Sequence, residues 1–327
     1  MPGLIKALSR CGANVTYSSL HCLKAFGALF VIIIHFGSLG SKEYLYPLIR
    51  TAVPFFFIIS GYFLYRESRT DAISKCTATL KKLLALTLYA NLFCYLTGRH
   101  ILPFHSVKHC IMLLHLGVDG HLWYLSAYVE VLIVVIVAMR LKCEKWLWGI
   151  APWFVLMGLV MGRYNFLFDG IPNHLLLSRN FLTMGIPCFG IGWLLRKYRD
   201  QVLQHIRKPL LFLVVLFILS GIEAFVVLKY YRGYSGDYLV LTMPVAAALV
   251  YYCIQNPTLG CGTVLEYIGK HYSAEVYIFH MLIGRMLLKI IDSVGIARPH
   301  LLLPFLIFIC TLGFVYIWRN TSKSVFK

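Results

Sequence analysis

Acidic residues are scarce in this chain, and charged residues of both signs are fewer than a soluble protein normally has. The 327 residues include 13 Asp and Glu against 31 Lys and Arg, and charged residues are 13% of the total. A soluble globular domain carries about 25%. With 59% hydrophobic residues and a mean hydropathy of +0.74, the composition argues against a soluble enzyme and predicts a protein of apolar membrane helices.

The sequence also lacks any CxxC pair, and its ten cysteines do not have the spacing of a disulfide framework. Cys94, Cys188, Cys253 and Cys310 lie inside apolar runs, so we expect small, buried packing residues there. We expect no cleavable signal peptide either, because the first apolar run is long and has no small-residue cleavage site.

Long apolar runs, separated by short basic or Pro/Gly-containing gaps, account for most of the sequence. A membrane-spanning helix needs about 20 apolar residues. By this criterion we expect about ten spans, near residues 21–40, 45–65, 80–98, 121–140, 146–162, 179–197, 207–229, 237–254, 271–291 and 300–318. The sequence therefore predicts an all-α, polytopic membrane helix bundle, formed by a single domain over residues 1–327 with no appended soluble domain.

The distribution of Lys and Arg predicts the orientation of this bundle. The even-numbered gaps are the more basic ones, with Arg66, Arg69, Lys75, Lys81 and Lys82 in the second, Arg140, Lys142 and Lys145 in the fourth, and Arg196, Lys197, Arg199, Arg207 and Lys208 in the sixth. By the positive-inside rule these gaps and both termini are cytoplasmic. The net charge of +18 therefore indicates contacts with anionic lipid or phosphate rather than with nucleic acid.

Two polar residues interrupt the first apolar run, which reads LKAFGALFVIIIHFG over residues 23–37. Lys24 and His35 are eleven residues apart, so on a helix they lie within about 20° of one face and about 16 Å apart along the axis. In the predicted orientation, Lys24 lies at the cytoplasmic end and His35 two thirds of the way across. A cation and a titratable base on one face outline a path for a charged substrate. Alternatively, Lys24 snorkels to the lipid surface and His35 is a core histidine with satisfied hydrogen bonds.

Further polar residues lie in or beside other apolar runs, where ionisable groups are functional candidates. They include Ser60 with Gly61, His121 with Trp123 in GHLWYL, and Glu130, Glu223, His271, Glu275 and His280. His271 and Glu275 have the i,i+4 spacing of an ion pair. His105 and His109 share that spacing, but without a clear set of acidic or cysteine partners we expect no metal.

Four blocks of sequence, taken in order, resemble the acyltransferase-3 family of integral-membrane acyltransferases, which acylate hydroxyls of cell-envelope and exported glycans. They are Lys24 eleven residues before His35, FFFIISGYFL at 55–64, HLWYL at 121–125, and IGKHYSAEVYIFH at 268–280. The resemblance covers nearly the whole chain. It departs from the family at Lys24, where arginine is usual, and near the third span, where Lys75, Lys81 and Lys82 stand in place of an arginine pair. Lysine keeps the charge but loses the bidentate fork.

The resemblance implies an acyl-CoA donor, acetyl-CoA above all, on the cytoplasmic side. Its phosphates would be bound by Lys24, Arg66, Lys81 and Lys82, and its acyl-pantetheine arm would pass the gap beside Gly61. His35 would act as the general base that takes the proton of the acceptor hydroxyl. His121, Trp123 and Ser60, in this order of preference, would stabilise the oxyanion, and His280 would support the ring of His35 or relay a proton.

The expected partners are membrane lipid and a glycan or glycolipid acceptor, in a bacterial-type cytoplasmic (inner) membrane. The acceptor would be handled by the outer loops at 99–120 and 163–178, or by a separate extracytoplasmic protein. Three other functions stay open: a proton-coupled transporter that uses His35, Glu275 and His280, a non-enzymatic membrane subunit, and a relative of the membrane half of the vancomycin-resistance serine racemases.

Overall fold

A computed structural model describes residues 17–37, 45–97, 112–113, 115–168, 171, 178–230, 238–299 and 301–325, with side chains as far as 320. These residues are helical or lie in turns and connections, and the described part of the chain contains no strand. The all-α fold class predicted from the sequence is therefore confirmed for this part of the chain.

Thirteen α-helices are described. They are α2 (Ser18–Phe36), α3 (Tyr46–Ile49), α4 (Ala52–Leu64), α5 (Arg69–Leu96), α7 (Trp123–Arg140), α8 (Glu144–Val160), α10 (Ile186–Lys197), α11 (Arg199–His205), α12 (Pro209–Tyr230), α13 (Thr242–Gln255), α14 (Val264–His271), α15 (Ser273–Ser293) and α16 (Leu303–Val325). Short 3₁₀ turns, η2 (Gly120–Leu122) and η3 (Asn165–Leu167), and a π-helical turn, η4 (Phe181–Gly185), complete the described elements.

Helices occupy each of the ten ranges that the sequence assigns to membrane spans. Five of them are both long and apolar enough to cross a membrane: 18–36, 46–64 with α3 and α4 together, 120–140, 209–230 and 303–320. The described residues thus support a membrane protein, while the count of ten spans and the cytoplasmic location of both termini stay predictions. The short helices α11 and α14, which lie between apolar runs, were not expected.

Proline residues explain where several helices begin. A proline lacks the backbone N–H that the first turn of a helix leaves unpaired anyway, so it fits there without cost. Six helices carry one in their first turn: Pro47 in α3, Pro54 in α4, Pro187 in α10, Pro209 in α12, Pro244 in α13 and Pro304 in α16. Pro54 therefore starts a helix rather than kinking one.

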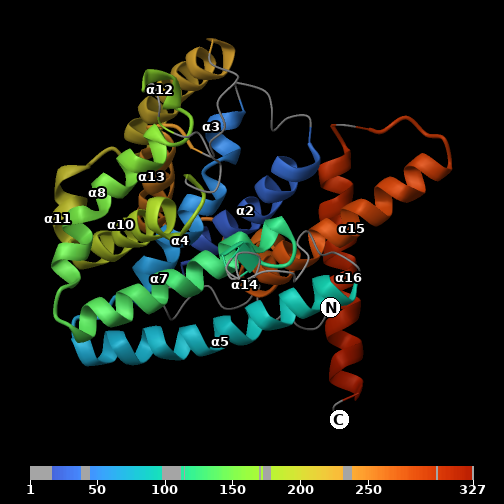
Figure 1. Ribbon diagram of the computed structural model, residues 1–327, viewed down its shortest axis with the longest axis horizontal. Helices are drawn as coiled ribbons and strands as arrows, with labels where there is room; N and C mark the ends of the chain where they lie inside the picture. The colour runs from blue at the N-terminus through green and yellow to red at the C-terminus, as the bar shows by residue number, and fades with distance from the viewer. Residues whose placement is uncertain are drawn as a thin grey trace. The chain divides into compact units, whose positions relative to one another are not determined.

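The chain divides into two compact units. The first comprises Met1–Phe56, Lys208–Phe225 and Ala248–Lys327, and the second comprises Phe57–Arg207 and Val226–Ala247. Figure 1 shows the helices of both units.

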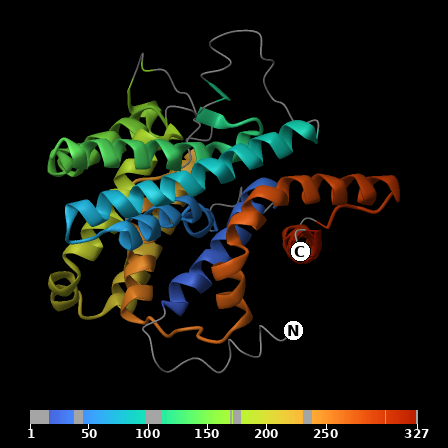
Figure 2. The same cartoon turned by 90° about the horizontal axis from the view of Figure 1, so that it is seen from below.

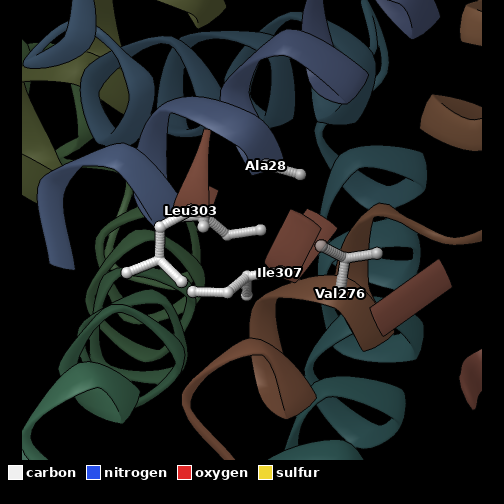
Figure 3. Packing of buried hydrophobic residues seen from close by; sticks show 5 residues of the cluster. Ala28, Val276, Leu303 and Ile307 are labelled. Atoms are coloured by element: carbon white, nitrogen blue, oxygen red, sulfur yellow. The ribbon is translucent and has the colours of Figure 1, made fainter. Parts of the chain in front are cut away.

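The first unit is organised around α2, which packs against α14, α15 and α16 (Figure 2). Its apolar core joins three of these helices (Figure 3): Ala28 and Ile32 of α2, Val276 of α15, and Leu303 and Ile307 of α16, all nearly inaccessible to solvent. Burying such side chains stabilises a helix pair by van der Waals contact even where lipid replaces water outside.

α2 and α14 approach each other closely in this unit. A Cβ atom added to Gly269 would collide with the backbone carbonyl oxygen of His21. Small residues at a crossing let two helix backbones touch, which is the usual basis of helix pairing in membranes. Gly269 therefore fixes the position of α14 against the end of α2 that carries Lys24.

The second unit has a comparable crossing between α4 and α10. A Cβ on Gly61 would collide with the carbonyl of Phe189, and a Cβ on Gly192 would collide with the carbonyl of Ile58. Each glycine thus leaves room for the backbone of the other glycine's helix. In the same unit α5 and α7 run side by side (Figure 1).

A proline also explains the π-helical turn η4, which precedes α10. Pro187 has no N–H to donate to the carbonyl of Thr183, four residues earlier. The hydroxyl of Tyr238 donates to this carbonyl instead, at 3.1 Å, and the side chain of Asn180 caps the turn by accepting from the backbone N–H groups of Leu182 and Thr183. The interrupted helix is therefore fully compensated inside an apolar bundle.

The second, fourth and sixth gaps are linked by polar contacts within the second unit. Arg69 donates to the carboxylate of Glu144 at 2.8 Å, and Arg196 donates to the hydroxyl of Tyr62 at 3.2 Å. Partial burial alone would raise the pKa of the Glu144 carboxyl, but the hydrogen bond and charge of Arg69 hold it below its ordinary value. Such contacts are what a shared membrane side for these gaps requires. The assignment of that side to the cytoplasm stays a prediction.

The cysteines follow the sequence interpretation with two differences. Cys94, Cys188 and Cys253 are free and buried, as expected for packing residues, whereas Cys310 is free but exposed. Cys261 is disulfide-bonded, so the prediction that cysteines act here only as packing residues is wrong at this position.

The crossing of α4 and α10 can be tested with a matched pair of glycine substitutions. We expect Gly192→Ala to destabilise the protein by about 1–3 kcal/mol, because its methyl group meets the carbonyl of Ile58. Gly221→Ala in α12 has open space around it, so we expect it to be neutral or to stabilise by up to about 1 kcal/mol through helix propensity. Thermal unfolding in detergent measures both. Equal effects of the two substitutions would contradict the assigned packing.

Candidate functional site

α2 carries Lys24 and His35, the first two of the predicted site residues, and its ends differ from the prediction. The helix begins at Ser18 and ends at Phe36, several residues earlier than the predicted range of 21–40. Lys24 therefore lies in its second turn, and His35 lies in its last turn rather than two thirds of the way across. Lys24 is half-buried and His35 is exposed.

The face of α2 between these two residues is apolar and packed. Ala28 and Val31, which lie on it, are almost wholly buried, and Ala28 contacts the core shared with α15 and α16. Within the described residues of the first unit, Lys24 and His35 are thus separated by a packed strip and do not share a continuous polar seam. The predicted path along this face is corrected accordingly.

His35 lies next to a second histidine, as the sequence interpretation proposed. The ring centroids of His35 in α2 and His280 in α15 are 5.5 Å apart, with an angle of 39° between the ring planes. The ring of Phe36 also packs edge-on against the ring of His280, and the two ring centroids are 6.4 Å apart. Two residues separated by 245 positions are therefore brought together by the packing of α15 on α2.

His280 is fully buried, and its own helix fixes its ring. Its Nδ1 lies 2.7 Å from the carbonyl oxygen of Tyr277 and 3.2 Å from that of Val276. A ring nitrogen facing two carbonyl oxygens carries the proton and donates it, so the tautomer assigned to His280 has Nε2 as the acceptor nitrogen. His280 is thus an oriented imidazole beside the exposed ring of His35.

The opposite end of α2 carries two lysines close to one another. Lys24 and Lys270 both act electrostatically on His21, and Glu266 is the acid that opposes them. The sequence assigns phosphate binding to Lys24 but not to Lys270, because Lys270 lies on α14 and comes close to Lys24 only through the Gly269 crossing. A group of positive charges beside a helix crossing is suited to binding phosphate.

Glu266, the acid that opposes these lysines, has a structural role. Its carboxylate accepts from the hydroxyl of Ser18 at 2.6 Å and from the backbone N–H of Gly262 at 2.7 Å, while the side chain of Thr263 caps the start of α14. This is a variant of the capping box, in which a threonine and a glutamate three residues later satisfy the first turn. Glu266 therefore joins α14 to α2.

Glu275 does not form the ion pair that its spacing from His271 suggested. Its carboxylate accepts from Arg319 near the end of α16, and the same guanidinium donates to the backbone carbonyl of His271 and lies over the ring of Tyr272 at 4.8 Å. The predicted pairing of His271 with Glu275 is thus replaced by an arginine clamp, which holds α16 at the junction of α14 and α15.

The other predicted site residues belong to the second unit. Ser60 in α4 shares a hydrogen bond with Tyr128 of α7. The space beside Gly61 is occupied by the backbone of α10. The room expected beside Gly61 for an acyl-pantetheine arm is therefore taken by the helix crossing, and we assign no passage there.

His121 and Trp123 lie at the start of α7. His121 is buried in η2, and its Nδ1 lies 3.5 Å from the carboxylate of Asp119, which is buried too. The guanidinium of Arg179 lies over the ring of Trp123 at 5.6 Å. A buried acid–imidazole pair and a stacked arginine give this helix end a concentration of polar groups.

His115 and Glu130 form a pair that the sequence interpretation missed. His115 Nδ1 lies 2.5 Å from the carboxylate of Glu130, and the imidazole stacks on Phe181 with an angle of 4° between the planes. His115 falls within the predicted outer loop at 99–120, outside the predicted spans. The two residues are fifteen positions apart in the sequence, and this spacing does not predict a contact. The sequence therefore carries no signal for this pair.

The remaining predicted cations are exposed. Arg66 donates to the carbonyl oxygens of Phe63 and Tyr65, at 3.0 and 2.6 Å, and so caps the end of α4. Lys81 and Lys82 lie on α5. His105 and His109 lie outside the described residues, and no group of three potential metal ligands occurs among the residues that are described.

Comparisons with known proteins place this arrangement in context. Residues 17–319 match the Acyl_transf_3 family model, described as an acyltransferase domain. A serine/alanine racemase of Enterococcus gallinarum is 25% identical, over 93% of this chain and 46% of the racemase. The chain thus spans about half the length of this curated relative. No solved structure matches significantly.

The arginine clamp can be tested by a double-mutant cycle. Arg319→Gln and Glu275→Gln should each lower the unfolding free energy, and the double variant should lose less than their sum, with a coupling of up to about 1 kcal/mol because both side chains are partly exposed. Unfolding in detergent, followed by tryptophan fluorescence, measures the cycle. Additive losses would show that the two side chains do not interact.

Proposed function

The chain belongs to the acyltransferase-3 family, and on this premise we propose that it moves an acyl group, acetyl above all, from cytoplasmic acyl-CoA to a hydroxyl of an envelope or exported glycan. The observation that carries the proposal is the pair of imidazoles, in which the exposed His35 lies beside the buried and oriented His280.

The proposed reaction assigns the proton transfer to His35. The acceptor hydroxyl attacks the thioester carbonyl while His35 takes its proton, which forms the new C–O bond and a tetrahedral intermediate. The intermediate then collapses to the ester as its C–S bond breaks. The proton then passes from His35 to the departing thiolate of CoA. A positioned base of this kind contributes about 10²–10⁴ in rate. His280, whose ring is fixed by the Tyr277 carbonyl, orients His35 or relays the proton.

We assign the donor phosphates to the cations at the start of α2. Lys24 and Lys270 supply fixed positive charge there, and Arg66, Lys81 and Lys82 in the second unit are further candidates. Lys24 and His35 lie about 16 Å apart along the helix. This separation suits a donor such as CoA, whose phosphates and thioester are at opposite ends of a long, uncharged arm.

The tetrahedral intermediate requires hydrogen-bond donors for its oxyanion. We propose His121, Trp123 and Ser60 for this role, in that order. The burial of His121, whose Nδ1 lies 3.5 Å from the carboxylate of Asp119, supports it, because a closely packed ring keeps one orientation. The acceptor would be delivered by the outer loops or by a separate extracytoplasmic protein, in a bacterial inner membrane.

A second candidate function follows from the relative named serine/alanine racemase. Its matched part is under half of that protein, and this chain could serve as a membrane subunit that handles an amino acid rather than a glycan. A proton-coupled transporter has less support. Its proposed relay includes Glu275, whose carboxylate is paired with Arg319.

The function of His35 can be tested with acyl-labelled acetyl-CoA. Membranes with the unchanged chain should incorporate label into envelope glycan, and His35→Ala should lower the rate by about 10²-fold or more through loss of the base. His205→Ala is the matched control, since His205 is exposed on α11 and interacts with a carbonyl of its own helix. Equal incorporation by His35→Ala would refute the base. If no acceptor became labelled and the membranes took up labelled serine or alanine, the second candidate would be favoured.

The function of Lys24 can be tested by steady-state kinetics. Lys24→Ala should raise the KM for acetyl-CoA with little change in kcat, because it removes a phosphate contact distant from the reacting carbonyl, while Lys24→Arg should be tolerated. Lys289→Ala is the control, because Lys289 is an exposed lysine near the C-terminal end of α15. An unchanged KM in Lys24→Ala would remove Lys24 from the donor site.

A further inference from the structure

An apolar groove lies between α7 and α8 in the second unit, and none of its residues has a role in the proposed acyl transfer. Its volume is about 720 Å³. The exposed large side chains along it are Ile133 and Val137 of α7, Leu141 directly after α7, and Trp146, Ile150 and Trp153 of α8. On each helix these residues recur at intervals of three or four, so each set forms one stripe facing the groove.

The groove is exposed along its length. Trp146 is 82% exposed and Trp153 68%, and the other four large side chains are exposed as well. In a protein that spans a membrane, apolar side chains on the outer surface face lipid rather than water. The concave apolar surface between α7 and α8 matches the shape of a lipid acyl chain.

The turn that closes one end of the groove has a defined geometry. α7 ends at Arg140, and the N–H groups of Lys142 and Cys143 donate to the carbonyls of Met139 and Ala138, at 3.2 and 2.9 Å. These two hydrogen bonds form a Schellman motif, in which the residue after the C-cap adopts a left-handed conformation. Lys142 occupies this position with φ of +59°.

A lysine at this position is unusual. Glycine adopts positive φ without steric cost, whereas a side chain there carries a penalty. The chain therefore has a cation at a place where the backbone favours glycine. The function of Lys142 is to be sought in its side chain, which is exposed.

Two more cations surround this end of the groove. Arg140 and Lys145 flank Lys142 in the sequence, and both are exposed. The acid in this turn, Glu144, is bound by Arg69 and so offsets little of their charge. Leu141, which lines the groove, lies between two of the three cations.

We propose that this groove binds one anionic phospholipid, with an acyl chain along the stripes of α7 and α8 and the phosphate headgroup at Arg140, Lys142 and Lys145. Charge complementarity supports this occupant, because basic clusters beside membrane helices bind anionic headgroups. A second copy of the chain would bring two sets of like cations together across a two-fold contact, which is unfavourable. The site is independent of the proposed acyl transfer.

The headgroup interaction can be tested by native mass spectrometry of the full chain, titrated with phosphatidylglycerol or with phosphatidylcholine of the same chains. We expect phosphatidylglycerol to bind more tightly, with an affinity that falls as salt rises. Lys142→Gly should weaken its binding by about fivefold, the contribution of one cation, while phosphatidylcholine binding stays unchanged. Since glycine suits the positive φ, this variant should keep or gain thermal stability.

The acyl-chain interaction can be tested by filling the groove. Gly149 lines it, and a Cβ there meets no atom within 4 Å, so Gly149→Phe should place a ring in the groove without disturbing the fold and should lower binding of both lipids. Gly221→Phe, equally unobstructed on α12, is the control and should bind lipid normally.

Two results would overturn the proposal. Equal affinity for the two lipids, unaffected by Lys142→Gly, would show that the cations do not bind the headgroup. Normal phosphatidylglycerol binding by Gly149→Phe would show that the groove does not hold the chain. A change of oligomeric state in that variant, with unchanged lipid binding, would point to a second copy as the occupant instead.

Discussion

The hydrogen bond from the imidazole of His280 to the backbone carbonyl of Tyr277 is the interaction on which the proposed chemistry depends. A buried histidine without an acceptor for its N–H would lose several kcal/mol in an apolar bundle. Because its own helix provides that acceptor, His280 is held in one orientation next to His35. The orientation of the reactive pair is thus a result of helix geometry and needs no further polar residue.

Close helix crossings place this pair and the cations in space. Gly269 brings α14 onto α2, and Gly61 and Gly192 bring α4 and α10 together, in each case by direct contact of backbones. In an apolar environment such contact replaces the hydrophobic effect as the source of association. The same glycines that a sequence motif marks as functional are therefore first of all packing residues. Gly61 shows this most clearly, because its missing side chain gives room to a helix instead of a substrate.

Most of the fold could be predicted from the sequence, because apolar runs of about 20 residues have few alternatives to a helix. The family and the neighbourhood of His35 and His280 followed from ordered motifs. Other features depend on partners distant in the sequence, which periodicity does not reveal. Glu275 was matched with the nearby His271 but pairs with Arg319, and His115 was taken as a loop residue but binds Glu130. The end of α2 was placed too late, because apolar residues continue to Leu39 while the helix stops at Phe36.

The early end of α2 has a consequence for the electrostatics of the imidazole in its last turn. The final carbonyl groups of a helix carry a partial negative charge, equivalent to about half an electron, and this field favours a cation near the terminus by about 0.3–1 kcal/mol. His35 lies within that field, whereas a position in mid-helix would feel little of it. An imidazolium formed at His35 would therefore find part of its counter-charge in the peptide dipoles of its own helix, so that the backbone itself takes the part that a carboxylate plays in other enzymes.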